Sequence, residues 1–272
     1  MNKQLKISII TGTLNRGGFI EKNIQSVLNQ NYDNFEHIII DGGSSDNTLT
    51  VLNKYPHLKW MSEPDKGQAD AFNKGLAIAT GDIIGWLDSD DYYLPDIFSK
   101  IANSFLEHDD IRWVVSDIFD ERNSSNKRKR VQVGEINYYN LLRNPDIVVQ
   151  QGAFYRKEIL DKVKGCEIDL YMIQDFELWL KLSKISTPAK LNMVSAVFVR
   201  HDTQKSTYKN SLIQINEIYR VLRKEKISKY LLFKVLMRKY CILIKQLIKI
   251  VLIRLKLLDK KYLFLAVRNN YQ

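Results

Sequence analysis

Residues 83–91 read IIGWLDSDD, and this stretch decides the fold class. Its first five residues are apolar or small, which is typical of a strand buried on both faces of a sheet. Polar residues follow at once, because Asp88-Ser89-Asp90-Asp91 places three carboxylates directly after the strand. In open α/β sheets, ligands bind beyond the carboxyl ends of the strands, so this cluster predicts the position of a binding site.

The sequence before this stretch alternates between strand and helix patterns. Three more buried strands are predicted in the first hundred residues, at 6–10, 37–40 and 58–61. Helices are predicted between the strands from apolar residues at helical spacing, at 19–29, 45–52 and 68–79. This alternation indicates a mostly parallel central sheet covered by helices, which is an α/β sandwich.

The order is less regular from residue 112 to residue 200. Strands are predicted at 112–116, 152–156 and 196–200, and a helix at 175–183. Residues 123–130 are predicted to form a polar loop. The run Lys127-Arg128-Lys129-Arg130 within it is interpreted as a solvated loop rather than a binding patch.

Composition narrows the class of protein. The chain has 272 residues, of which 45% are hydrophobic and 26% charged, so general disorder is excluded. Its two cysteines, Cys166 and Cys241, are far apart in sequence, which argues against a disulfide framework and favours a reducing compartment. The apolar run near residue 7 is too short for a signal peptide, and the pattern predicts no conventional membrane span.

The net charge of +10 is distributed unevenly. Residues 208–272 hold sixteen Lys and Arg against three acidic residues, a net charge of +13, whereas the first 207 residues carry −3. We therefore divide the chain into a body, residues 1–207, and a basic amphipathic helical tail, residues 208–272. A nucleic-acid binder is expected to carry its basic face on the folded domain, so no nucleic-acid partner is predicted.

The three clustered carboxylates indicate a metal site. They repel one another unless something neutralises them, and Mg²⁺ or Mn²⁺ does this best because both prefer oxygen ligands and also bind phosphate oxygens. Thr11 and Asp41 end two other predicted strands, so we expect them in the same crevice. Two other interpretations stay open at this point: Asp41 is also typical of a turn, and the acids after residue 87 also suit the cap of a helix.

A metal site of this kind favours a substrate that brings its own negative charge, such as a diphosphate. The sequence contains no GxxxxGK[ST] phosphate loop, and no GxGxxG follows the first strand. These absences argue against a P-loop NTPase and against an ordinary dinucleotide dehydrogenase.

Five segments, in order along the chain, resemble the motifs of family 2 glycosyltransferases with the GT-A fold. They are SIIT (8–11), IIIDGGSSD (38–46), SEPDKG (62–67), NKG followed by ATGD (73–82), and LDSDD (87–91). The similarity covers about residues 6–206 and is closest to bacterial members that build surface polysaccharides. It implies a GT-A-like nucleotide-binding body and a manganese- or magnesium-dependent, inverting transfer. The sugar would move from a nucleotide diphosphate-sugar donor to a saccharide or lipid-linked acceptor.

The resemblance also implies roles for the residues around the donor. Thr11 and Asp41 would contact its nucleoside, and many relatives carry Asp-Asp-Gly-Ser where this chain has Asp41-Gly42-Gly43-Ser44. The segment Asp65-Lys66-Gly67-Gln68 would line the pocket for the nucleotide and the donor sugar.

Asp88-Ser89-Asp90 is similar to the family's DXD element, so Asp88 and Ser89 would bind the donor and Asp90 the metal. Asp91 would share the metal or bind the sugar.

Two later motifs resemble the acid–base and metal elements of the family. Gln174-Asp175 lies where relatives usually show Glu-Asp, which implies that Asp175 is the general base for the acceptor hydroxyl. Without the resemblance, Asp175 is more typical of a helix N-cap. His201 resembles the histidine of an Arg-x-His element and would complete the metal shell, although alone it is more typical of a hydrogen-bonded surface residue. The loop 202–208 would close over the diphosphate.

The tail is predicted to be helical. Residues 208–223 form an amphipathic pattern that suits packing on the body. Beyond Ile227, dense apolar residues lie opposite basic residues at 234, 238, 245, 249, 256 and 260. The pattern favours a helix on an anionic membrane surface over a hairpin on the body or a dimer interface, and the oligomeric state stays open. With a lipid-linked acceptor, this places the protein in the cytoplasm, peripheral at the inner face of the cell membrane.

Three functions are compared. The leading hypothesis is a glycosyltransferase. The alternatives are a catalytically silent, membrane-docked nucleotide-sugar-binding or scaffold protein, and a nucleotidyltransferase, which would release pyrophosphate instead of a nucleoside diphosphate. The joint presence of Asp88, Asp90, Asp91 and Asp175 argues against a silent protein.

Overall fold

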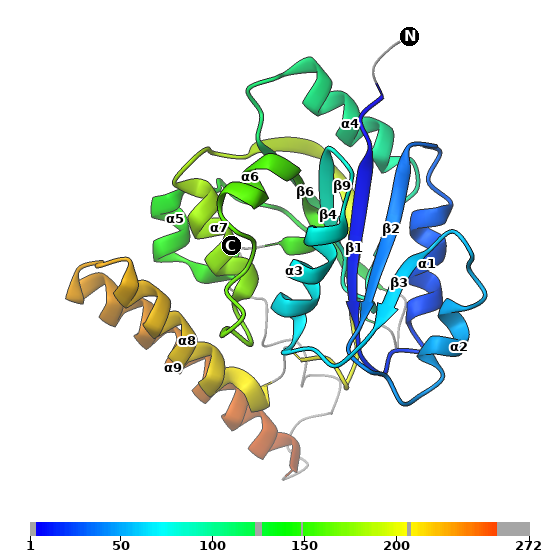
Figure 1. Cartoon of the computed structure of the whole chain (residues 1–272). Helices are drawn as coiled ribbons and strands as arrows, with labels where there is room; N and C mark the ends of the chain where they lie inside the picture. The colour runs from blue at the N-terminus through cyan, green and yellow to red at the C-terminus, as the bar shows by residue number, and fades with distance from the viewer. Residues whose placement is uncertain (1–3, 123–126, 148, 206–207, 255–272) are drawn as a thin grey trace.

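The computed structural model describes residues 4–122, 127–147, 149–205 and 208–254 (Figure 1). Nine strands within these ranges form one sheet in the order β3-β2-β1-β4-β8-β6-β9-β5, and β7 pairs with β6 outside this order. Helices cover the sheet, and two long helices of the tail lie along one side of the body. The chain therefore has the α/β class that its sequence predicts, followed by a C-terminal helical region.

The first part of the sheet is parallel, as predicted. It consists of β1 (Ile7–Thr13), β2 (Phe35–Asp41), β3 (Lys59–Ser62) and β4 (Ile83–Trp86). The helices between them are α1 (Ile20–Leu28), α2 (Thr48–Leu52) and α3 (Gln68–Ile78). Because β2 and β3 lie on one side of β1 and β4 on the other, the strand order reverses between β1 and β4. Such a switch point is where open α/β sheets bind ligands.

The centres of β1, β2 and β4 are buried on both faces of the sheet, whereas the edge strand β3 is largely exposed. Ile39 of β2 packs with the buried apolar residues of α1 and α2. Ile38 and Ile40 belong to the larger core on the opposite face, which includes Phe72 of α3 and Trp86 of β4. The rings of Phe72 and Trp86 stack at a centroid distance of 4.2 Å. This packing fixes the ends of β1 and β4, from which the binding site is built.

The second part of the sheet is mixed. β8 (Ala153–Arg156) pairs antiparallel with both β4 and β6 (Trp113–Arg122). β9 (Ala189–Arg200) runs parallel to β6, and β5 (Tyr92–Tyr93) pairs antiparallel with β9. The sequence pattern identifies part of β6, β8 and β9 but not their directions, because direction depends on connections that do not follow the strand–helix alternation.

The predicted polar loop at 123–130 is wrong over its last residues. Arg128–Val131 form β7, which pairs antiparallel with β6. Arg128 forms a 2.6 Å ion pair with Glu121, and Arg130 forms a 2.7 Å ion pair with Asp117. The two carboxylates lie on β6 and are buried, whereas the basic side chains of 127–130 are exposed, so the predicted loop is wrong but the predicted exposure to solvent is confirmed.

The remaining helices of the body complete its core. They are α4 (Ile97–Glu107), α5 (Tyr138–Arg143), α6 (Lys157–Lys162) and α7 (Gln174–Ser183), with short 3₁₀ turns at Pro145–Ile147, Gln150–Gly152 and Tyr208–Asn210. Trp179 of α7 donates a 2.7 Å hydrogen bond to the Tyr155 hydroxyl of β8. Its ring lies 5.2 Å from that of Trp113 on β6. These buried aromatic contacts fix the start of α7, where Asp175 lies.

The tail forms two helices that pack side by side, α8 (Ser211–Lys224) and α9 (Lys229–Arg254). α8 packs on the body through buried residues such as Ile218 and Leu222. α9 is tied to the body by Arg238 and Lys239, which both bind Asp146. Among the described residues, none of the helices is long and apolar enough to cross a membrane. The predicted basic positions 256 and 260 lie outside the described residues.

Glu36 of β2 links several elements of the body through a buried carboxylate. It accepts hydrogen bonds from Ser8 at 2.5 Å, Lys59 at 2.6 Å and the backbone amide of Thr80 at 2.7 Å. Burial alone would raise the pKa of Glu36, but these donors outweigh it and hold the pKa well below its ordinary value.

We predict that Glu36→Gln lowers the free energy of unfolding by about 2–4 kcal/mol at neutral pH. The reason is that glutamine removes the buried charge to which Ser8, the Thr80 amide and two lysines all donate hydrogen bonds. The unfolded pKa of glutamate is about 4.3, so the stabilisation is fully present above that pH and is lost as the pH falls further. Urea unfolding from about pH 7 to about pH 3 measures both effects. Glu63→Gln is the control: Glu63 forms an exposed ion pair with Lys74, and its loss should cost less than about 1 kcal/mol. Equal losses in the two variants would contradict the prediction.

Candidate active site

A cleft of about 640 Å³ opens at the carboxyl ends of β1 and β4. Gly12 and Thr13 line it from β1, and Asp88, Ser89 and Asp90 line it from the loop after β4. The starts of α3 and α7 form further walls. The tail helices α8 and α9 close the side opposite the sheet. The cleft therefore lies beyond the carboxyl ends of the strands, as the sequence predicts, and at the switch point of the sheet. One of its walls belongs to the tail.

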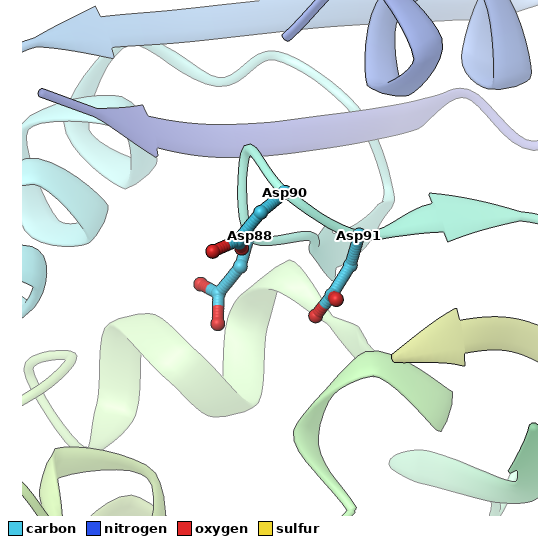
Figure 2. Close-up of side chains that lie close together, drawn as sticks. All are labelled: Asp88, Asp90 and Asp91. Carbon is cyan, nitrogen blue, oxygen red and sulfur yellow. The ribbon is translucent and has the colours of Figure 1, made fainter. Parts of the chain in front are cut away.

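The three clustered carboxylates converge as predicted. Asp88, Asp90 and Asp91 each offer one oxygen, and these oxygens lie within 4.8 Å of one another. Figure 2 shows the three side chains leaving the short loop between β4 and β5. Asp88 and Asp90 are half-buried and line the cleft, whereas Asp91 is buried beneath them.

Each carboxylate is held by a different set of neighbours. Asp88 accepts a hydrogen bond from the Gln68 side chain. Asp91 accepts one from Gln151 at 2.7 Å and one from the backbone amide of Val199 at 2.8 Å. The partners of Asp88 and Asp91 are therefore neutral, and they orient these two carboxylates without cancelling their charge.

Asp90 has partners that can carry positive charge. Its Oδ2 lies 2.8 Å from Nε2 of His201 and 3.8 Å from Nε of Arg16. The His201 ring stacks on Phe19 with a centroid distance of 4.4 Å, and its Nδ1 lies 2.9 Å from the Thr203 hydroxyl. His201 is thus placed beside the acidic cluster, one imidazole nitrogen directed at Asp90.

The electrostatics of the cluster favour a cation. Burial raises the pKa of Asp88 to about 7, and the charge of Asp90 adds to this effect. Burial also raises the pKa of Asp91, again with a contribution from Asp90. Buried carboxylates that lie this close together form a donor set of hard oxygens, which is the set that Mg²⁺ and Mn²⁺ prefer. These residues therefore fit a divalent cation.

Asp175 lies near the start of α7 and also lines the cleft. Its Oδ1 accepts a 2.8 Å hydrogen bond from the backbone amide of Phe176. Burial raises the pKa of Asp175, while the charges of Lys205 and Lys239 oppose the increase. The interpretation of Asp175 as a helix N-cap is wrong, because the N-cap of α7 is Ile173 and Asp175 lies within the first turn, from which it lines the cleft.

An amide relay joins the start of α7 to the acidic cluster. Gln174 donates a 2.6 Å hydrogen bond to Gln68, and Gln68 in turn donates to Asp88. Gln174 is buried, and its Oε1 has no hydrogen-bond partner within the described part of the chain. Gln174 is a neutral amide and therefore adds no further charge beside the cluster.

Three of the four residues in the segment 65–68, which is predicted to bind the nucleotide, line the cleft. Asp65, Gly67 and Gln68 line the cleft. Burial raises the pKa of Asp65, although its carboxylate accepts a 2.8 Å hydrogen bond from the Gly67 amide. Gly67 has a φ of 110°, a conformation that other residues rarely adopt, and it starts α3. Lys66 is exposed and is not among the residues that line the cleft.

Thr11 and Asp41 lie behind the cleft wall. The Thr11 hydroxyl is buried 3.0 Å from Nε2 of His37. Asp41 is fully buried and accepts hydrogen bonds from the Ser44 amide at 2.9 Å and the Ser62 hydroxyl at 2.6 Å. Neither is among the residues that line the cleft, and Gly12 and Thr13 occupy that position at the end of β1. Asp41 holds the loop that follows β2, whereas Thr11 links β1 to β2.

Several residues that line the cleft lie outside every motif of the sequence. Arg16, Gln151 and Tyr171 belong to no motif, yet they line the cleft. Lys205 lies in the predicted loop after His201, and its Nζ is 3.9 Å from the centre of the Tyr171 ring. Burial lowers the pKa of Lys205, while Asp88 and Asp175 oppose that change. Lys239 of α9 is buried against Asp146 and lines the same cleft.

Comparisons with known proteins agree with this geometry. Residues 8–164 match the model of glycosyl transferase family 2. The chain is 31% identical over 203 residues to WfaP from Escherichia coli, a UDP-Glc:alpha-D-GlcNAc-diphosphoundecaprenol beta-1,3-glucosyltransferase. The aligned region covers 72% of this chain and 77% of WfaP.

Solved structures show the same fold at low sequence identity. Residues 1–349 of TarS from S. aureus, in complex with UDP, match with a TM-score of 0.67 and 19% identity, and the match covers 87% of this chain and 72% of that fragment. TarS has also been solved in complex with UDP-GlcNAc. The mannosyltransferase PcManGT from Pyrobaculum calidifontis, in complex with GDP-Man and Mn²⁺, has a TM-score of 0.59 and 18% identity, covering 89% of this chain and 70% of that one. On the family match and the fold together, the chain belongs to glycosyl transferase family 2 and is a glycosyltransferase with the GT-A fold.

Proposed function

We propose that this enzyme transfers a sugar from a nucleotide diphosphate-sugar to a saccharide or lipid-linked acceptor, by a single inverting displacement that requires Mn²⁺ or Mg²⁺. One observation carries the proposal. Asp88 and Asp90 of the acidic cluster and the separate carboxylate of Asp175 line one cleft at the switch point of the sheet, and the buried Asp91 completes the cluster. The arrangement supplies a place for a charged leaving group and a separate group that can accept a proton.

The donor would lie with its nucleotide at the ends of β1 and α3, where Gly12, Asp65 and Gly67 line the cleft. Its diphosphate would point toward the acidic cluster. The resemblance to TarS, which binds UDP and UDP-GlcNAc, and to PcManGT, which binds GDP-Man, supports a nucleotide-sugar donor. These neighbours use two different bases, so the donor base is left to experiment.

The metal would be held by Asp90 and Asp91, with His201 close enough to join them. A bound divalent cation stabilises the negative charge that develops on a leaving diphosphate. Asp88 and Ser89 would contact the donor beside it. Gln68 and Gln151 keep two of these carboxylates in place, so their orientation does not depend on the ion.

Asp175 would remove the proton of the acceptor hydroxyl while that oxygen attacks the anomeric carbon. Its pKa is raised by burial, which makes it a stronger base than an exposed aspartate. Two other carboxylates line the cleft but suit this role less: Asp146 is bound by Arg238 and Lys239, and Asp65 lies at the nucleotide end. A single base without a paired nucleophile suits one displacement and therefore inversion.

We predict that Asp175→Asn lowers kcat by about 10²- to 10⁴-fold, because the amide cannot accept the proton. The assay follows release of nucleoside diphosphate from UDP-glucose, UDP-N-acetylglucosamine and GDP-mannose with Mn²⁺. Asp161→Asn, which removes only an exposed partner of Lys157, should leave kcat unchanged. Release of pyrophosphate by the wild type would instead support a nucleotidyltransferase. Nucleotide binding with no turnover of any donor would support a silent binding protein.

A second prediction concerns the metal. Nucleotide and Mn²⁺ together should raise the melting temperature of the wild type more than the sum of their separate effects, because a ligand that binds the folded state stabilises it. Asp90→Asn should remove this cooperative increase, whereas the exposed Asp33→Asn should keep it. The measurement is a thermal-shift titration of UDP and GDP with and without Mn²⁺. An undiminished increase in the Asp90 variant would contradict the proposed metal site.

We also propose that α9 binds an anionic membrane surface at the inner face of the cell membrane. One side of this helix is exposed and apolar over its whole length, with Tyr230, Phe233, Met237, Tyr240, Ile244, Leu247, Ile248 and Val251. Lys234 and Lys245 are exposed on the same helix, and the tail carries a net charge of +13. Apolar side chains flanked by lysines suit the interface of anionic lipid. The relative WfaP, whose name gives it a diphosphoundecaprenol-linked acceptor, supports a site of action at the membrane.

The full chain should sediment with vesicles that contain phosphatidylglycerol, less with pure phosphatidylcholine, and less again at high salt. Phe233→Ser combined with Ile244→Ser should reduce this binding by about tenfold or more, because each buried apolar side chain contributes about 1.5–3 kcal/mol. Leu212→Ser, on the exposed side of α8, is the control. The exposed residues also recur at a spacing that suits a helix pair. A chain that is dimeric in solution, becomes monomeric in the double variant and ignores vesicles would replace the membrane proposal with a dimer interface.

A further inference from the structure

Glu217 of α8 is a buried carboxylate that the proposed reaction does not use. It is 5% exposed, although α8 belongs to the basic tail. Its two oxygens accept hydrogen bonds from consecutive backbone amides of the body, Oε1 from Tyr171 at 2.7 Å and Oε2 from Met172 at 2.8 Å. Bonds from backbone amides to an ionised carboxylate are among the stronger hydrogen bonds in proteins, and successive backbone amides form a concave site for an anion.

The two amides belong to the loop 163–173, which leads directly into α7 and Asp175. The loop is fixed at its other end by Asn73 of α3, which donates to the Cys166 carbonyl at 2.8 Å and accepts from the Cys166 amide at 2.9 Å. Gly165 has a φ of 63°, and a Cβ there would lie 2.3 Å from the Asn73 side chain. The loop is therefore held from α3 at its start and from the tail at its end.

Glu217 holds the loop two residues before the cleft residues Gln174 and Asp175. Tyr171, whose amide it binds, also lies in the cleft under the ammonium group of Lys205. Ile173 lies between the held amides and α7, and it is buried. A shift at residues 171–172 would therefore move the first turn of α7 and the ring beneath Lys205 together.

We propose that Glu217 is a positioning residue for Asp175, so that the tail helix α8 sets the geometry of the catalytic base. The carboxylate is required because both of its oxygens accept a bond from an N–H group. Glutamine keeps the shape but turns one acceptor into a donor, which would then face a backbone N–H. The catalytic part of this inference rests on the proposed function, whereas the contact between α8 and the loop does not.

The test compares Glu217→Gln with Glu225→Gln in the full chain. Glu225 caps the C-terminal end of α8 and binds Tyr138 and Lys184 of the body, so its variant weakens the attachment of α8 without touching the loop. Amide hydrogen exchange of peptides that contain Tyr171 and Met172 should become faster in Glu217→Gln and stay as slow as in the wild type in Glu225→Gln. Exchange that is unchanged in Glu217→Gln would overturn the inference.

The kinetic arm measures hydrolysis of UDP-glucose, UDP-N-acetylglucosamine and GDP-mannose with Mn²⁺. Glu217→Gln should lower kcat by about 10- to 100-fold while the KM for the donor stays within about twofold, because a misplaced base slows the chemical step without weakening donor binding. Glu225→Gln should keep both values. An unchanged kcat in a folded Glu217→Gln protein, or a change in KM alone, would overturn the positioning role. If the wild type hydrolyses none of the three donors, the proposed function fails with the positioning role, and the exchange data still decide whether Glu217 holds the loop.

Discussion

Mutual repulsion among carboxylates is the constraint on which this site depends. Asp88, Asp90 and Asp91 lie within a few ångströms of one another at the end of a buried strand, where water screens their charges poorly. In the described part of the chain, the protein places His201 and Arg16 beside Asp90. It orients two of them with the neutral amides of Gln68 and Gln151 and leaves the nearest guanidinium, that of Arg16, 3.8 Å from Asp90. The remaining negative charge is therefore available for a ligand, and a divalent cation with a diphosphate meets that requirement.

The sequence predicted the part of the fold that local patterns determine. The runs at 6–10, 37–40 and 83–87 are short, apolar and closely followed by polar residues, so both the parallel strands and their carboxyl-end loops could be located. The structure extends these predictions to β1, β2 and β4 with small changes of boundary. The acidic cluster could also be predicted, because three acids within four residues cannot lie far apart.

The sequence did not predict features that depend on contacts between residues far apart along the chain. The basic run of β7 has the composition of a solvated loop, and only the acids Asp117 and Glu121 on β6 explain why it forms a strand. Likewise, Thr11 and Asp41 follow predicted strands correctly, yet their hydrogen bonds with His37 and Ser62 turn them away from the cleft. Hydrophobic periodicity reports which face of an element is covered, but it does not report which polar partner a buried side chain meets.

The net charge of the tail does not show which of its charged residues are exposed. Its charge suggested a basic appendage, but Lys239 is buried against Asp146 and lines the cleft, and Glu217 of α8 holds the loop before Asp175. α9 thus has one side in the cleft and another that is exposed and apolar. Because a helix with its side chains is only about 10 Å across, a surface bound by the exposed side would lie about that far from the cleft lining. In the proposed function, a membrane on α9 would bring a lipid-linked acceptor to the catalytic base without requiring the body to approach the lipid.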